Sequence, residues 1–266
     1  MKLAGRKEIA LVPTMGALHA GHLSLISLAK KYCDDVWVSI FINPLQFENE
    51  SDLEKYPRDI EKDRTLARSV GATNIWSPTA NEIYPGDPEE ISSGALGQQY
   101  EGVNRPGHFD GVLTVVNRLF DLVQPRYAIF GEKDFQQLYL IKQWVREYAI
   151  PVKIIEAPLV RDGDGLALSS RNSQLSDYDR DISLVISKAL FQAAKEVTIN
   201  SARKVLRESL KREVRFVLDY AEIIEEETFD TATELSVNPR AIVAGWVNGL
   251  RLLDNMQMRS KLSGQV

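Results

Sequence analysis

Hydrophobic residues in the first two thirds of the chain alternate between short continuous runs and helix-like spacing. Runs typical of buried strands cover residues 8–12, 36–42, 73–76, 127–131 and 152–157. Apolar positions repeat at helical spacing over residues 21–33, 53–70, 110–123 and 135–148. Because strands and helices alternate, the pattern predicts an α/β fold with a parallel sheet covered by helices on both faces. In such sheets ligands bind beyond the carboxyl ends of the strands.

The last part of the chain has a different pattern, which predicts a second, smaller domain. Residues 178–196 and 201–213 have the spacing of amphipathic helices, and strand-like runs follow at 216–224, 240–247 and 249–253. Gly163 and Gly165 interrupt the apolar pattern between residues 160 and 171. We therefore predict a parallel-sheet domain over residues 1–160 and a small α+β domain over residues 161–266.

The longest stretch without a clear period, residues 78–107, is rich in Pro, Gly, Asn and Gln. It predicts irregular surface structure with short elements that the pattern does not resolve. At its end, His108 is expected to be structural and Asp110 to cap the helix over residues 110–123.

Composition and charge exclude several classes of protein. The 266 residues are 44% hydrophobic and 26% charged, which is typical of a globular chain and excludes a disordered or fibrous one. A net charge of -5 argues against a nucleic-acid partner. The 1 Cys excludes an intrachain disulfide, and no apolar run approaches the roughly 18 residues of a membrane helix. Glu8 and Pro13 interrupt the stretch that a signal peptide would need, so we expect a cytoplasmic protein.

The first candidate site lies in residues 13–22, directly after the first predicted strand. His19 and His22 are three positions apart, so both imidazoles share a face if a helix begins there. Backbone N–H groups at a helix start favour phosphate oxygens, and Gly16 and Gly21 let a ligand approach the backbone closely. Two imidazoles can donate hydrogen bonds to the charge that grows in a phosphoryl transition state. The alternatives are a turn glycine with two capping histidines, or a zinc site that lacks a third ligand at a recognisable spacing.

A second cluster, residues 130–137, also follows a strand. Lys133 is a compact cation for a polyphosphate, and Gln137 can bond a hydroxyl or a carboxylate. On its own the cluster favours a charged turn in which Asp134 caps the next helix, since charged turns are common.

Two further stretches carry polar groups in places where a ligand could bind. Ser169, Ser170 and Arg171 lie in a glycine-flanked loop, where they could form a mobile anion clamp or an ordinary polar linker. Asn43 and Gln46 follow the strongest strand, and their amides could orient a small polar substrate on an apolar wall.

Taken together and in order, these stretches resemble the signature blocks of the pantoate–β-alanine ligase (pantothenate synthetase) family. The matching blocks are residues 13–22, 42–47, 130–137 and 168–171, and the closing Arg251-Leu-Leu-Asp-Asn255 also matches. The resemblance covers nearly the whole chain. It implies a Rossmann-like parallel sheet of the nucleotidylyltransferase type, a superfamily that shares the paired-histidine motif with class I aminoacyl-tRNA synthetases.

The resemblance implies a reaction in two steps. The pantoate carboxylate attacks the α-phosphate of ATP, which releases pyrophosphate and leaves pantoyl adenylate. The amine of β-alanine then attacks this mixed anhydride and gives pantothenate and AMP. The implied partners are ATP, pantoate and β-alanine, with no nucleic acid or membrane, and the implied assembly is a homodimer. Mg²⁺ would travel with the ATP phosphates, with few direct protein ligands and no metal site of the protein's own.

The resemblance also implies roles for single residues. His22 would be the proton donor, with His19 beside it and Lys133 on the phosphates. Gln46 and Gln137 would bind pantoate, Gln46 would also face β-alanine, and Asn43 and Arg105 are weaker candidates in the same pocket. The residues implied in nucleotide binding are Met15, Gly16, Ala17, Leu18, His19, Ala20, Gly21, His22, Gly131, Glu132, Lys133, Asp134, Val160, Leu168, Ser169, Ser170 and Arg171.

Two features differ from the family pattern. Leu168 replaces the usual Met, and we expect adenine packing to survive because both side chains are apolar and unbranched at Cβ. The segment before Pro13 is shorter than the family norm, so we expect different packing at the N-terminus. The alternatives are another adenylyl-transferring enzyme of the superfamily, or a nucleotide-sensing protein with a dead site. The second would predict loss of the histidines or of Lys133, and all three are present.

Overall fold

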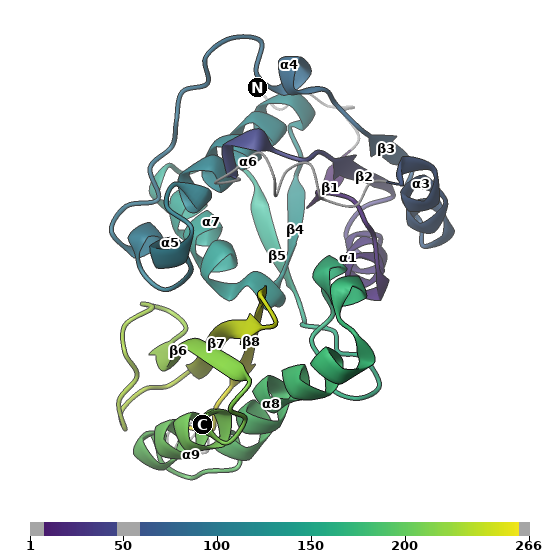
Figure 1. Cartoon of the computed structure of the whole chain (residues 1–266). Coiled ribbons are helices and arrows are strands. Elements are labelled where there is room, and N and C mark those ends of the chain that lie inside the picture. Colours follow the sequence, from purple (N-terminus) through teal and green to yellow (C-terminus); the bar gives the residue numbers. More distant parts are fainter. Residues whose placement is uncertain (1–7, 47–58, 261–266) are drawn as a thin grey trace. The chain divides into compact units, whose positions relative to one another are not determined.

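The computed structural model describes residues 8–46 and 59–260, which divide into two compact units (Figure 1). The first unit is Met1–Glu132 with Gln136–Pro158, and the second is Lys133–Phe135 with Leu159–Val266. The expected N-terminal packing difference, Phe47 of the substrate-site block and residues 53–58 of a predicted helix lie outside the described residues.

The first unit is built on a five-stranded sheet in the order β3-β2-β1-β4-β5. Every neighbouring pair is parallel, which confirms the predicted α/β class. The strands are β1 (Ile9–Thr14), β2 (Asp35–Ile40), β3 (Asn74–Trp76), β4 (Tyr127–Gly131) and β5 (Lys153–Ala157). The chain order reverses between β1 and β4, so the carboxyl ends of these two strands form the switch point where such sheets bind ligands.

Helices cover both faces of this sheet. Val12 of β1 clusters with Ile26 of α1 and Ala67 of α3, whereas Leu11 points to the opposite face and is also fully buried. Figure 1 shows α6 and α7 alongside β4 and β5. The longer helices are α1 (Ala20–Ala29), α3 (Ile60–Ser69), α6 (His108–Val123) and α7 (Phe135–Glu147). The short elements are η1 (Pro44–Gln46), α4 (Ala80–Ile83), η2 (Leu96–Gln98), α5 (Glu101–Asn104) and η3 (Glu132–Asp134).

Helix α6 begins two residues earlier than predicted, and Asp110 does not cap it. Gly107 occupies the N-cap position with a φ of 75°, a conformation that favours glycine. Asp110 lies in the first turn and accepts hydrogen bonds from the backbone N–H and the hydroxyl of Ser93, both at 2.6 Å. The carboxylate therefore fastens the preceding loop to α6. The local pattern does not indicate this role, because Ser93 is 17 positions away along the chain.

The second unit packs two helices on an antiparallel sheet in the order β6-β7-β8. Its core contains Leu190 and Leu206 from the helices and Ile223 and Val243 from the sheet. The elements are η4 (Ser170–Gln174), α8 (Asp177–Ala193), α9 (Ile199–Lys211), β6 (Phe216–Glu225), β7 (Pro239–Val247) and β8 (Leu250–Gln257). Strand β8 runs four residues beyond the predicted end at Leu253, because its buried polar residues obscure the strand pattern.

The turn Lys133–Phe135, which follows β4 and ends on the first residue of α7, groups with the second unit. The ring of Phe135 stacks on that of Phe229, with ring centroids 6.1 Å apart. The guanidinium of Arg240 lies 4.3 Å from the centroid of the Phe135 ring. Lys133, a residue expected at the phosphates, therefore belongs to the unit that carries the Ser169–Arg171 loop.

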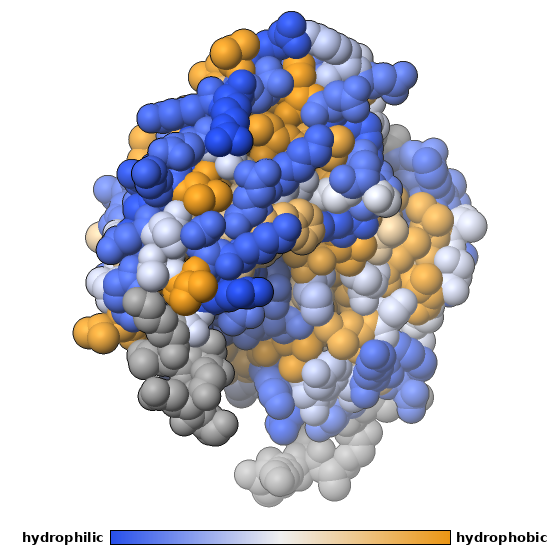
Figure 2. Space-filling view, turned by 90° about the horizontal axis from the view of Figure 1, so that it is seen from below, coloured by the Kyte–Doolittle hydropathy of each residue, from blue (hydrophilic) through white to orange (hydrophobic). Residues whose placement is uncertain are grey.

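The visible surface in Figure 2 mixes hydrophilic residues with separate hydrophobic patches. Single exposed side chains such as Val214 and Leu235 are common on protein surfaces and need no functional assignment. Within residues 8–46 and 59–260, no helix combines the length and hydrophobicity needed to cross a membrane.

Candidate active site

The paired histidines follow a tight turn at the carboxyl end of β1. Gly16 and Ala17 both have positive φ angles, 91° and 51°. A Cβ on Gly16 would lie 2.9 Å from an oxygen of Asp63 and 3.1 Å from Ile40, so only glycine fits there. This turn leads directly to His19, which is the N-cap residue of α1.

Asp63, which the sequence analysis did not single out, holds this turn in place. Its two carboxylate oxygens accept the backbone N–H groups of Ala17 at 2.9 Å and of Leu18 at 2.7 Å. Asp63 is only 2% exposed and lies on the same face of α3 as the buried Ala67. The sequence does carry a signal for this role. Asp63 lies four positions before Ala67 and therefore on the same, buried face of the helix, where a carboxylate needs a partner.

His19 and His22 cap the start of α1 with their own rings. The Nδ1 atom of His19 accepts the N–H of Gly21 at 3.1 Å, and Nδ1 of His22 accepts the N–H of His19 at 3.4 Å. The ring centroids are 4.1 Å apart. Because Nδ1 accepts in both rings, each neutral ring carries its proton on Nε2. The two histidines therefore do cap α1, as the capping alternative predicts. The same contacts orient two Nε2–H donors at the positive end of the helix.

We expect Gly16→Ala to destabilise the first unit by about 1–3 kcal/mol, because the new Cβ meets Asp63 at a backbone angle that alanine disfavours. Urea unfolding measures the change. Gly86→Ala is the matched control, since a Cβ there meets nothing within 4 Å. Equal stability of the two variants would contradict this account of the turn.

We expect Asp63→Asn to cost about 1–3 kcal/mol and to slow the reaction, because the amide NH₂ would face a backbone N–H that now has an acceptor. Asp59→Asn is the control on the same helix. Asp59 caps α3 through Lys62 N–H, and asparagine caps equally well. Unfolding and initial-rate measurements on both variants check this, and similar losses in the two would contradict it.

The amides expected to bind substrate, Asn43 and Gln46, lie at η1 just beyond β2. Both side chains are buried, and Nδ2 of Asn43 lies 3.3 Å from Oε1 of Gln46. Asn43 Nδ2 also donates to the carbonyl of Gly111 at 2.9 Å, and the Tyr84 hydroxyl donates to Asn43 Oδ1 at 2.9 Å. Burial raises the pKa of Tyr84, which keeps this hydroxyl protonated. Asn43 therefore has its hydrogen-bonding capacity engaged in holding η1.

Gln46 connects the substrate candidates to the nucleotide candidates. Its Nε2 lies 2.8 Å from the sulfur of Met15, in the turn before the histidines. His108 supports it from α6, with Nδ1 3.0 Å from the Gln46 carbonyl oxygen. The expectation that His108 is structural agrees with this contact.

Met15 and Gly16 also line a cavity of about 470 Å³ in the first unit. Its walls are mainly apolar, which suits a small ligand with a hydrocarbon body. The other described residues that line it are Ile40, Phe41, Ile42, Pro44, Asp59, Ile60, Asp63, Ser77, Pro78, Thr79 and Ala80.

The remaining candidates of the first unit follow β4 or precede α6 in the chain. Gly131 ends β4 and Glu132 begins η3, so both follow the strand next to β1. Gln137 is half-buried in the first turn of α7, and Arg105 lies in the turn between α5 and α6. The roles of Gln137 and Arg105 stay predictions.

In the second unit, a short hairpin positions the Ser169–Arg171 clamp. Leu168 N–H donates to the Val160 carbonyl at 3.0 Å, which closes the hairpin. Ser169 then caps η4, and its hydroxyl accepts the N–H of Arg171 at 3.3 Å. Ser170 is the first residue of η4. The clamp residues are therefore part of an ordered turn, and their role as an anion clamp stays a prediction.

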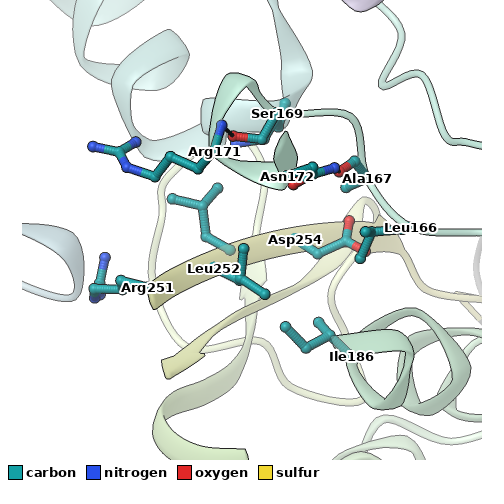
Figure 3. Close-up of a pocket in the computed structure, with 11 residues that line it drawn as sticks. Leu166, Ala167, Ser169, Arg171, Asn172, Ile186, Arg251, Leu252 and Asp254 are labelled. Carbon is teal, nitrogen blue, oxygen red and sulfur yellow. Dashed lines mark hydrogen bonds between the residues drawn. The ribbon is translucent and has the colours of Figure 1, made fainter. Parts of the chain in front are cut away.

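Basic residues from distant parts of the sequence line one small pocket in this unit. Lys133 and Arg171 share it with Ser169 and Asp254. Arg251 also lines it, and in Figure 3 its guanidinium and that of Arg171 extend to the same side. Arg251 is tied to Asp219 at 2.5 Å. In the sequence Arg251 stands out only as part of the closing motif, because nothing in its local pattern indicates a pocket.

Lys133 is anchored through its backbone rather than its charge. Its carbonyl accepts a hydrogen bond from Nδ2 of Asn255 at 2.9 Å. Its Nζ lies 3.5 Å from Asp134, a long contact for an ion pair. Burial raises the pKa of the neighbouring Asp254, and a bidentate contact from Arg161 opposes that shift.

The zinc alternative requires a third ligand near the two histidines. Among the residues that the structure describes, no group of three or more His, Cys, Asp and Glu side chains is arranged to hold a metal ion.

Comparison with known proteins identifies the family. A model of the pantoate-beta-alanine ligase family matches residues 1–257. The pantothenate synthetase of Acidothermus cellulolyticus is 45% identical over 264 residues, which cover 94% of this chain and 86% of that protein. The pantothenate synthetase structure from Thermus thermophilus matches with a TM-score of 0.89 and 40% identity, over 94% of this chain and 93% of that one.

A third match is the pantoate-beta-alanine ligase of Francisella tularensis, whose structure is a complex with beta-gamma ATP and beta-alanine. It has a TM-score of 0.79 and 36% identity, and the match covers 96% of this chain and 92% of that one. The residues matched by the family model include the sheet, the histidine turn and the closing motif. The chain therefore belongs to the pantoate–β-alanine ligase family, and it is a ligase that condenses pantoate with β-alanine using ATP.

Proposed function

We propose that this ligase works through a pantoyl adenylate formed at the start of α1. A carboxylate oxygen of pantoate attacks the α-phosphorus of ATP, the bond from that phosphorus to the bridging oxygen breaks, and pyrophosphate leaves. The amine nitrogen of β-alanine then attacks the acyl carbon and loses a proton. The acyl carbon–oxygen bond breaks, and AMP leaves as pantothenate forms. No covalent bond to the protein is needed, since the adenylate itself is the activated acid.

The observation that carries this proposal is the arrangement of His19 and His22. Their Nδ1 atoms are engaged by backbone N–H groups at the first turn of α1. Each neutral ring can therefore offer its Nε2–H to a phosphate oxygen, beside the positive end of the helix dipole. Negative charge grows on those oxygens in the transition state, so donors held in advance accelerate the step. We assign His22 as the proton donor and His19 as its neighbour on the phosphates.

The remaining nucleotide contacts divide between the two units. We assign the turn from Met15 to His22, with Gly131 and Glu132, to the nucleotide in the first unit. Lys133, Asp134, Val160 and residues 168–171 take the corresponding role in the second unit, whose residues 161–266 we propose to act as a lid. The pocket that Lys133 and Arg171 line supports this, because basic side chains there suit a polyphosphate.

The substrate acid is assigned to the first unit. We assign pantoate to Gln46 and Gln137, with Gln46 also facing β-alanine. Asn43 supports Gln46 by the contact between their side chains and has little capacity left for substrate. Arg105 stays a weaker candidate.

Mg²⁺ is proposed to arrive with the ATP phosphates. When bound, it would neutralise charge on the phosphate oxygens and align them. The polar side chains that line the clamp pocket in the described residues fit this mode of binding, since Lys133, Arg171 and Arg251 are basic and Asp254 is the one carboxylate among them. Basic groups contact phosphate rather than metal.

Oxygen transfer tests the adenylate. Pantoate labelled with ¹⁸O in both carboxylate oxygens is incubated with ATP, Mg²⁺ and β-alanine, and the nucleotide products are analysed by mass spectrometry. We expect AMP that carries one ¹⁸O, together with unlabelled pyrophosphate, because one carboxylate oxygen stays on phosphorus. ADP with labelled inorganic phosphate would instead indicate an acyl phosphate and would overturn the proposal.

We also propose that the enzyme is a cytoplasmic homodimer, which rests on the family resemblance. Sedimentation velocity at micromolar concentration distinguishes a dimer from a 30.0 kDa monomer.

A further inference from the structure

The closing motif, Arg251–Asn255, contains two adjacent buried polar residues that the proposed chemistry does not use. Asp254 is 4% exposed and Asn255 is 3% exposed, both near the end of β8. Burying such groups is costly unless their hydrogen bonds are satisfied. The hydrogen-bond partners of Asp254 and Asn255 therefore indicate what these two residues do.

Asn255 bonds in a way that only an amide can satisfy. Its Oδ1 accepts from the guanidinium of Arg240 at 2.7 Å, and its Nδ2 donates to the carbonyl of Lys133 at 2.9 Å. An arginine can only donate and a carbonyl can only accept, so the orientation of the amide is fixed. The partner carbonyl is 122 positions away in sequence and belongs to a residue assigned to the phosphates.

Arg240 holds the other end of the same turn. Its guanidinium covers the ring of Phe135, and its Nε donates to Glu226 at 2.7 Å. Lys133 and Phe135 are thus both held by one connected network of side chains from the sheet of the second unit and the loop that follows β6.

Asp254 reaches in the other direction, to the base of the clamp hairpin. Its carboxylate accepts two hydrogen bonds from Arg161, at 2.5 and 2.9 Å. The same guanidinium donates to the carbonyl of Gly165 at 3.0 Å, and Arg161 pairs with Ala167 across the hairpin. Ser169 follows two residues later. Asp254 and Ser169 line one pocket in Figure 3.

We propose that Asp254 and Asn255 are positioning residues. They fix the positions of Lys133 and the Ser169–Arg171 clamp relative to each other, so that both can contact the ATP phosphates. The inference rests on the proposed role of Lys133. Neighbouring positions on one strand fix the spacing between two phosphate-binding elements that are far apart in sequence. A transition state is more sensitive to this spacing than a bound substrate is, so the loss appears in kcat more than in KM.

Asn255→Asp tests the inference with little change in volume. Aspartate keeps an oxygen for Arg240 and places the other oxygen against the Lys133 carbonyl. We expect kcat of pantoate-dependent ATP–pyrophosphate exchange to fall by about tenfold to a hundredfold, with KM for pantoate nearly unchanged. Ser209→Ala is the control, because it removes one buried side-chain hydrogen bond, to Gln192, elsewhere in the same unit. Its kcat should match that of the original chain at a comparable loss of thermal stability.

A double-mutant cycle shows whether Asn255 acts through Lys133. In a Lys133→Ala background, Asn255→Asp should cause little further loss of the single-turnover rate, since the residue that it positions is gone. Asn255→Ala repeats the cycle without the repulsive oxygen and serves if the aspartate variant fails to fold. A loss of the same size in both backgrounds, or a wild-type kcat in Asn255→Asp, would overturn the inference.

The same cycle separates this inference from the proposed function. If Lys133→Ala alone left the exchange rate unchanged, the phosphate role of Lys133 would be wrong, whatever Asn255 does. Asp254→Asn extends the test to the clamp. Its effect should persist in the Lys133→Ala background and disappear in Arg171→Ala, and the reverse result would contradict the role given to Asp254.

Discussion

Replacing His22 with alanine should lower the rate of pantoyl adenylate formation by about a hundredfold or more, with a smaller effect on ATP affinity. The expected loss is large because the Nε2–H of His22 is proposed to act on charge that develops only in the transition state. Rapid-quench measurement of AMP and pyrophosphate formation gives the rate, and equilibrium binding of ATP gives the affinity.

Two further variants separate donation to phosphate from capping of α1. In His22→Asn, the side-chain oxygen can replace Nδ1 as the acceptor of His19 N–H, but no donor extends to the Nε2 position. In His22→Gln, an NH₂ group lies near the Nε2 position. We expect the asparagine variant to be as slow as alanine and the glutamine variant to recover part of the rate. Unchanged turnover in His22→Ala would remove this residue from the mechanism.

Lys133→Ala should cause the second-largest loss, also about a hundredfold or more, in pantoate-dependent ATP–pyrophosphate exchange. The ammonium is proposed to bind the phosphates, and alanine supplies no charge. Folding should be unaffected, because Asn255 holds the Lys133 carbonyl and not its side chain. Exchange kinetics and a thermal unfolding curve together check both parts.

The controls for Lys133 test charge and position separately. Lys142→Ala removes a lysine that pairs with Glu156 on the surface at 2.6 Å, and it should leave exchange near the original rate. Lys133→Arg keeps the charge but changes its shape and reach, so we expect only partial recovery. Full activity in Lys133→Ala, or unfolding of that variant, would contradict the roles given to its side chain and carbonyl.

The parallel sheet could be predicted because its strands are short apolar runs with clear ends. Strand β4 occupies the predicted residues 127–131, and Gln124-Pro125 before it ends the preceding helix as its sequence suggests. In the described residues α3 begins at Ile60 with Asp59 as its N-cap, a local signal that the predicted helix over residues 53–70 did not use. Local patterns of this kind determine element type well and element ends less well. The start of α6 and the end of β8 differ from prediction because contacts with distant residues decide them.

The histidine turn could be found in the sequence because its chemistry is contiguous, from Gly16 to His22. Asp63 was missed because it acts on Ala17 and Leu18 from 46 and 45 positions away. Asn255 was recognised only as part of a motif, since its partner Lys133 is 122 positions away. The residues that bind a ligand lie close together in sequence motifs. The residues that hold them in place come from distant parts of the chain that the fold brings near.

The most direct test of the central claim is a crystal structure of this protein with a non-hydrolysable ATP analogue and pantoate. The account predicts α-phosphate oxygens within hydrogen-bonding distance of Nε2 of His19 or His22, with the pantoate carboxylate approaching the same phosphorus. An analogue bound away from the first turn of α1, or imidazole rings that make no contact with it, would contradict the claim.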